Sequence, residues 1–68
     1  MQKWKEISLN CEISRLIRAA QRAGQLGDAT LECVKKHDGF MAYHNAKMSH
    51  YWAREVVSHR EKILELSK

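Results

Sequence analysis

The carboxyl-terminal part of the chain, from Phe40 onwards, contains no proline and carries one apolar stripe at helical spacing. Steps of three and four residues separate the members of the stripe, and their mean is close to the repeat of an α-helix. Only a long helix places such a set on one side, so the pattern predicts a helix with a docking surface along it. The members are Met41, Asn45, Met48, Trp52, Val56, His59, Ile63 and Leu66.

The length of the chain, 68 residues, is enough for one small domain (1–68). A domain of this size buries too little surface to be comfortably stable alone, and disulfides, a metal or oligomerisation usually compensate. Cys11 and Cys33 lack the density of a secreted disulfide scaffold, so we expect reduced thiols in a cytoplasmic protein. No apolar run is long enough for a signal peptide or a membrane span. We therefore expect a soluble protein that self-associates.

The clearest break in the chain is the segment around Gly24 and Gly27. Gly24 has the properties of a helix C-cap, and Asp28 those of an N-cap. The sequence therefore predicts a first helix over about 8–23, followed by a turn over 24–28.

The pair Asp38–Gly39 is a strong turn signal. A break there gives a second helix over about 29–38 and a third over about 40–66. In the alternative, Gly39 is absorbed at a cost of about 1 kcal/mol and one helix of about forty residues results. We favour the break.

Two apolar strips on the last helix are the main reason to expect a homodimer. The second strip lies roughly opposite the first and consists of Ala46, Ala53, Val57 and Leu64. The first helix has its own apolar face, made of Leu9, Ile13, Leu16, Ile17, Ala20 and Ala23. That face can cover only one strip, which leaves the other for a second copy or another protein. The predicted fold is all-α, a helical hairpin or three-helix arrangement completed by homodimerisation.

The chain is basic, with 12 Lys and Arg against 8 Asp and Glu. This balance is compatible with nucleic acid or with an acidic protein partner. Arg15, Arg18 and Arg22 lie on one side of the first helix and could follow a phosphate backbone. Nucleic-acid binding through these arginines is the alternative function.

Cys33, His37 and His44 point roughly the same way on a helix, and a helical Cys-x3-His pair can supply half a zinc site. His37 and His44 lie about 10 Å apart along the axis, too far to share an ion. No oxyanion-forming loop or orienting acid accompanies the thiols. We expect no metal, no cofactor and no catalytic residue.

The middle of the last helix is rich in aromatic and methionine side chains, which are enriched at protein interfaces. We predict that the interface is formed by Met41, Met48, Tyr51, Trp52, Val56, His59, Ile63 and Leu66. Asn45 and His59 could set the register of the paired helices.

The chain is short and proline-free, with two thiols and the polar-aromatic stretch Tyr43–Trp52. In these features it resembles the small all-helical accessory proteins of temperate, lambda-like phages. The resemblance implies a non-enzymatic regulator that binds a host or phage protein, often as a dimer. We therefore expect a small regulatory adaptor that acts through protein–protein contacts.

Overall fold

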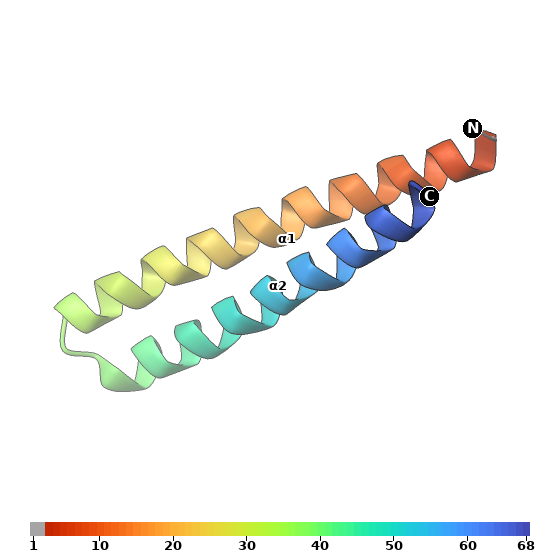
Figure 1. Ribbon diagram of the computed structural model, residues 1–68. Helices are drawn as coiled ribbons and strands as arrows, with labels where there is room; N and C mark the ends of the chain where they lie inside the picture. The colour runs from red at the N-terminus through yellow and green to blue at the C-terminus, as the bar shows by residue number, and fades with distance from the viewer. Residues whose placement is uncertain (1–2) are drawn as a thin grey trace.

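The computed structural model describes residues 3–68 as two α-helices packed antiparallel in a hairpin (Figure 1). Helix α1 spans Lys3–Lys35 and helix α2 spans Gly39–Leu66. The described part of the chain contains no β-strand, so the predicted all-α class is confirmed, and of the two arrangements left open, a hairpin or three helices, the structure has the hairpin. The hairpin is long and thin: its Cα atoms extend over 53 × 13 × 11 Å. Their radius of gyration is 15.6 Å, against about 11 Å for a compact domain of this length.

The side chains between the two helices form a seam, in which residues recur by alternating steps of three and four. A mean period of 3.5 is that of helices that supercoil around each other. The seam residues of α1 are Leu9, Glu12, Leu16, Ala19, Ala23, Leu26, Thr30 and Cys33. Those of α2 are Ala42, Asn45, Ser49, Trp52, Val56, His59, Ile63 and Leu66.

The turn between the helices confirms the break predicted at Asp38–Gly39 and excludes the single long helix. The backbone N–H of Asp38 donates to the carbonyl of Cys33 at 2.9 Å, and that of His37 donates to Val34 at 3.0 Å. This is the Schellman pattern of a helix end, and it needs a left-handed residue, here His37 with φ of 58°. The Asp38 side chain then accepts from the backbone N–H of Met41 and caps α2.

The predicted turn over 24–28 is wrong, because α1 continues through both glycines. Neither glycine has a positive φ, so Gly24 is not a C-cap, and Asp28 lies exposed within the helix rather than at its start. The three-helix arrangement, with separate helices over 8–23 and 29–38, is therefore replaced by a single helix. A helical glycine costs about 1 kcal/mol relative to alanine, and seam residues on both sides, Ala23 and Leu26, hold this segment against α2.

The face of α1 that packs on α2 is rotated from the predicted one. Ile13 and Ile17 are 38% and 50% exposed, whereas Glu12 and Ala19 are 8% and 1% exposed. Small side chains in the seam let the two helix axes approach, and this leaves the larger isoleucines at the side. In α2, Ala42 and Ser49 lie in the seam, whereas Met41 and Met48 of the predicted docking stripe lie beside it and are exposed.

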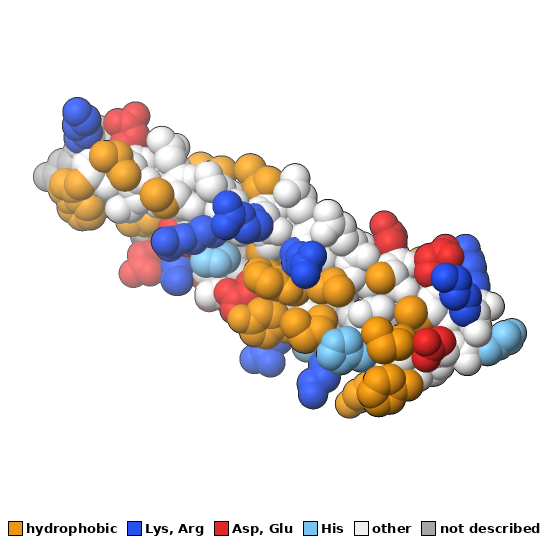
Figure 2. Space-filling model, turned by 180° about the vertical axis from the view of Figure 1, so that it is seen from behind, with side chains coloured by type: hydrophobic (Ala, Val, Ile, Leu, Met, Phe, Trp, Pro, Cys, Tyr) orange, Lys and Arg blue, Asp and Glu red, His pale blue; other side chains and the backbone are white. Residues whose placement is uncertain are grey.

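The seam buries very little. Among residues 3–68, only Ala19, Ala42 and Glu12 are buried, and no large hydrophobic side chain is. Large hydrophobic side chains such as Phe40 and Tyr43 are 80% and 72% exposed. Figure 2 shows hydrophobic side chains at the surface over much of the length of the hairpin, interspersed with lysine and arginine. Neither helix, within the described residues, is apolar enough over a sufficient length to cross a membrane.

Candidate functional site

The most highly organised polar group in the structure lies in the seam, around Glu12. Its carboxylate oxygen Oε2 accepts a hydrogen bond of 2.6 Å from Nδ1 of His59, across the two helices. A carboxylate can only accept, so the proton of this bond belongs to His59 Nδ1. The second oxygen, Oε1, accepts from the guanidinium of Arg15 at 3.0 Å. Nε2 of His59 lies 3.6 Å from the carboxylate of Glu55, which is too long for a hydrogen bond.

These contacts hold the pKa of Glu12 below its usual value of 4.5. The hydrogen bond from His59 is the main cause of the lowered pKa, which desolvation opposes, and the nearby charge of Lys62 and the hydrogen bond from Arg15 lower it further. The hairpin is only two helices wide, so water remains close to the carboxylate and screens its charge. Glu12 is therefore an ionised acceptor within the seam.

Two further polar contacts join the helices among residues 3–68. The Ser49 hydroxyl donates to the carbonyl of Ala23 at 2.9 Å, and Nδ2 of Asn45 donates to Sγ of Cys33 at 3.5 Å. With the Glu12–His59 bond, they tie α1 to α2 at three levels, from the turn to the open end. A slip of one residue would break all three, so they set the register of the hairpin. Asn45 and His59, predicted to set the register of an interface with a second chain, form hydrogen bonds between the two helices of one chain.

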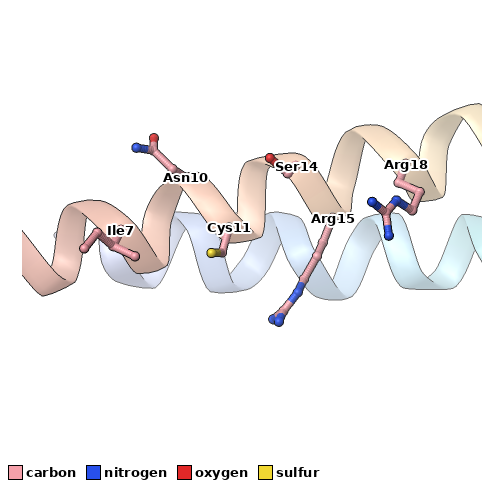
Figure 3. Close-up of a pocket in the computed structure, with 6 residues that line it drawn as sticks. All are labelled: Ile7, Asn10, Cys11, Ser14, Arg15 and Arg18. Atoms are coloured by element: carbon pink, nitrogen blue, oxygen red, sulfur yellow. The ribbon is translucent and has the colours of Figure 1, made fainter.

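The residues considered for chemistry are not assembled into a reactive site. Cys33 accepts a hydrogen bond from Asn45 in the seam. Residues 3–68 contain no group of three His, Cys, Asp or Glu side chains that could bind a metal ion. Cys11 is exposed in a shallow groove on the outside of α1. Figure 3 shows that Ser14, Arg15 and Arg18 line this groove with it, all from the same helix, so α2 adds nothing to it.

The structure divides the eight residues predicted as a protein interface into two groups. Five of them, Trp52, Val56, His59, Ile63 and Leu66, lie in the seam and pack towards α1. The other three, Met41, Met48 and Tyr51, are 39%, 36% and 51% exposed. Tyr51 lies edge-on to Trp52, with ring centroids 5.3 Å apart. Contact of this stripe with a second chain stays a prediction.

The three predicted nucleic-acid contacts lie on the exposed surface of α1. Arg15 is paired with Glu12, whereas Arg18 and Arg22 form no ion pair within residues 3–68. The positive charge available to a phosphate backbone is thus concentrated on Arg18 and Arg22.

A broad apolar face is the feature that the sequence analysis did not assemble. Gly27 and Leu31 of α1 line one shallow hollow together with Ala46, His50 and Ala53 of α2, so these residues share one side of the hairpin. Extended at helical spacing along both helices, this side contains Ile13, Ile17, Ala20, Gly24, Gly27, Leu31 and Val34 of α1 and Tyr43, Ala46, His50, Ala53, Val57, Arg60 and Leu64 of α2. We call it the apolar face.

The signal for this face was present in the sequence. Residues 13, 17, 20, 24, 27, 31 and 34 are separated by alternating steps of four and three, like the seam, and none is polar. The predicted turn at Gly24 hid this pattern, because it ended the helix in the middle of the row. The second apolar strip of α2, with Ala46, Ala53, Val57 and Leu64, is exposed, but it lies next to the seam rather than opposite the first stripe. Its neighbour on α1 was not identified from the sequence.

Comparison with protein-family models, with curated proteins and with solved structures finds no match to this chain. The protein is therefore described by its structure: it is a two-helix hairpin with polar contacts between the helices in its seam and an exposed apolar face.

Proposed function

We propose that the protein is a non-enzymatic interaction module that acts as a homodimer of helical hairpins and binds other proteins. The observation that carries this proposal is the surface area of the single chain. The hairpin exposes 5447 Å². A compact monomer of its mass, 7.9 kDa, exposes about 4,400 Å² on the usual scaling of surface with size.

The excess, about 1,000 Å², is close to what one partner buries in a standard protein–protein interface, about 800 Å². The elongated shape of the hairpin contributes to this excess, and the exposed surface includes many large hydrophobic side chains, among them Ile17, Leu31 and Val57. Large contiguous apolar patches on a protein surface often mark sites of protein–protein contact. A second copy would remove this surface from water and supply the core that the seam lacks.

The non-enzymatic part of the proposal is supported by the chemistry of the seam. Glu12 and His59, the one acid–base pair held at hydrogen-bond distance among residues 3–68, bond to each other. They lie between α1 and α2, where their hydrogen bond fixes the alignment of one helix along the other. The groove beside Cys11 and the one beside Tyr51 are each built from one helix, and the hollows lined by both helices are also open to solvent, so none of them shields a substrate from water.

The features shared with small phage accessory proteins support a wider proposal. They favour a regulatory adaptor of the cytoplasm whose target is a host or phage protein.

Sedimentation equilibrium over a concentration series, at low and high salt, tests the homodimer. We expect a dimer whose dissociation constant changes little with salt, because apolar contacts are not screened. A single species of 7.9 kDa at every concentration would refute it.

Nucleic-acid binding is the second candidate, and the unpaired guanidinium groups of Arg18 and Arg22 favour it. It requires binding of duplex DNA or RNA that weakens steeply with salt and is lost in an Arg15→Ala/Arg18→Ala/Arg22→Ala variant. Absence of binding at low salt would eliminate this candidate.

A further inference from the structure

We propose that the second copy docks on the apolar face, and that two hairpins form a four-helix bundle with this face at its centre. The proposal rests on the proposed homodimer and specifies its interface. It assigns dimerisation to a different surface from the predicted stripe of α2, most of which is used within the chain.

The size of the apolar face is suited to binding a second copy of the hairpin. From Ile13 to Val34 the row on α1 is about 30 Å long, at 1.5 Å per residue. Two adjacent helices are together about 20 Å wide, so the face covers roughly 600 Å² in projection. Its accessible area is larger because side chains protrude from it. It thus approaches the roughly 800 Å² that each partner contributes to a standard interface.

The charge distribution favours a second copy over a partner of other chemistry. The α1 row from Ile13 to Val34 has no ionisable side chain, and on α2 only His50 and Arg60 interrupt the apolar residues. A two-fold symmetric contact places a surface against itself, so the uncharged row of α1 would be covered by the same face of the second copy. Arg60, near one end of the row on α2, is the permanently charged side chain that such a contact would have to leave at its edge. An acidic protein segment or a phosphate backbone would find almost no cation there.

The opposite side of the hairpin is unsuitable for self-association. A hollow on that side is lined by Lys5, Glu12, Lys62 and Glu65, and both helices carry charge there. Pairing this side with itself would desolvate several charged groups, which costs free energy unless each finds a partner.

The shape of the apolar face also suits helix packing. Its middle is a shallow hollow, where Gly27, Ala46 and Ala53 present little or no side chain. Nothing of the hairpin lies within 4 Å of a Cβ added at Gly24. Leu31 is the large apolar side chain among the residues that line the hollow, and Ile17 and Val57 lie on the same face beyond one end of it. Small residues in the middle let helices of two copies approach closely, as in four-helix bundles.

A matched pair of variants tests the assignment by sedimentation equilibrium of the full chain. Ile17→Asp changes the apolar face, and Ile7→Asp changes the outside of the same helix, where the isoleucine is equally exposed (50% and 56%). We expect the dimer dissociation constant of Ile17→Asp to rise on the order of 100-fold, because a symmetric interface contains each substitution twice. Ile7→Asp should remain within about threefold of the unaltered chain.

A second pair on α2 follows the same logic. Val57→Asp lies on the apolar face, and Met48→Asp lies in the predicted interface stripe outside it, with exposures of 44% and 36%. Only Val57→Asp should weaken the dimer.

Ile17→Ala and Ile7→Ala separate association from folding, because alanine is the stronger helix former. A weaker dimer of Ile17→Ala with unchanged or increased helicity by circular dichroism supports the assignment even if Ile17→Asp does not fold. If the chain is dimeric but Ile17 and Val57 variants associate normally, the interface assigned here is wrong while the homodimer stands. If the unaltered chain is monomeric throughout, the homodimer itself is wrong.

Discussion

Replacement of Gly24 by alanine should change the stability of the chain in opposite directions, depending on whether Gly24 lies in a turn or within a continuous helix. In a turn, Gly24 would be a left-handed C-cap, and alanine would be strained there. In the structure, Gly24 lies inside α1 without a positive φ, and a Cβ added to it meets nothing within 4 Å. Alanine should therefore be tolerated and should gain the full difference in helix propensity, about 1 kcal/mol.

The gain is large on the scale of this protein. A domain of this length has a free energy of unfolding of roughly 3–10 kcal/mol, and 1 kcal/mol raises the melting temperature by about 4–8 °C. Gly27→Ala should behave similarly, because the added Cβ would lie 3.8 Å from Oγ of Ser49, an ordinary contact.

Thermal unfolding followed by circular dichroism measures this effect. The Ile17→Asp background removes the contribution of association, since Gly24 belongs to the apolar face. Gln25→Ala, at an exposed neighbouring position, is the control and should change the melting temperature less. A lower melting temperature for Gly24→Ala would refute the continuous helix.

Three further substitutions probe the turn and the seam. His37→Gly should raise stability by about 1 kcal/mol in denaturant titrations, because His37 has a positive φ that glycine adopts freely; a loss of stability would contradict the Schellman end. Glu12 has a lowered pKa in the folded chain, so its contribution to stability is complete above pH 4.5 and is lost as the pH falls through the lower folded value. Glu12→Gln should therefore flatten the dependence of melting temperature on pH below 4.5, and an unchanged acid profile would count against the seam geometry. Ala19→Leu should destabilise the hairpin by about 1–3 kcal/mol in chemical unfolding, because Ala19 is 1% exposed; a neutral effect would show that the helices are farther apart at this level.

The helical structure and the turn at Asp38 could be predicted from the sequence, because both depend on residues close together in the chain. The 3.5-residue spacing over Trp52, Val56, His59 and Ile63 continues for several turns, and the Asp38 side chain caps the helix that follows. The bounds of the last helix, about 40–66, are confirmed as Gly39–Leu66.

The side of each helix that faces the other could not be predicted from the sequence, because a prediction based on hydrophobicity places the wrong residues in the seam. Ile13 and Ile17 are more apolar than Glu12 and Ala19, yet the smaller and the charged residue lie in the seam. Glu12 can be buried only because His59 and Arg15 satisfy it, and a partner 47 positions away along the chain is not visible from local sequence. Gly24 and Gly27 were assigned to a turn because glycine is a strong local turn signal. The packing of Ala23 and Leu26 against α2 keeps this segment helical, but these contacts join residues far apart in the sequence and are not visible from local sequence.

The arrangement has a consequence for the exposed residues of α2. Met41, Met48 and Tyr51 lie outside the apolar face and would remain accessible in the bundle. Aromatic and methionine side chains are common at interfaces with other proteins. We expect this set, together with Arg18 and Arg22 on α1, to be the surface that a dimer presents to its target.

Isotope-filtered nuclear Overhauser spectroscopy on a mixture of labelled and unlabelled chains tests the central claim most directly, because it records contacts between copies only. We expect contacts between copies from the methyl groups of Ile17, Leu31 and Val57, and none from Ile7. Contacts between copies that involve Met41 and Met48 instead would place the second copy on the other side of the hairpin, and their complete absence would mean that the apolar face is not a self-association surface.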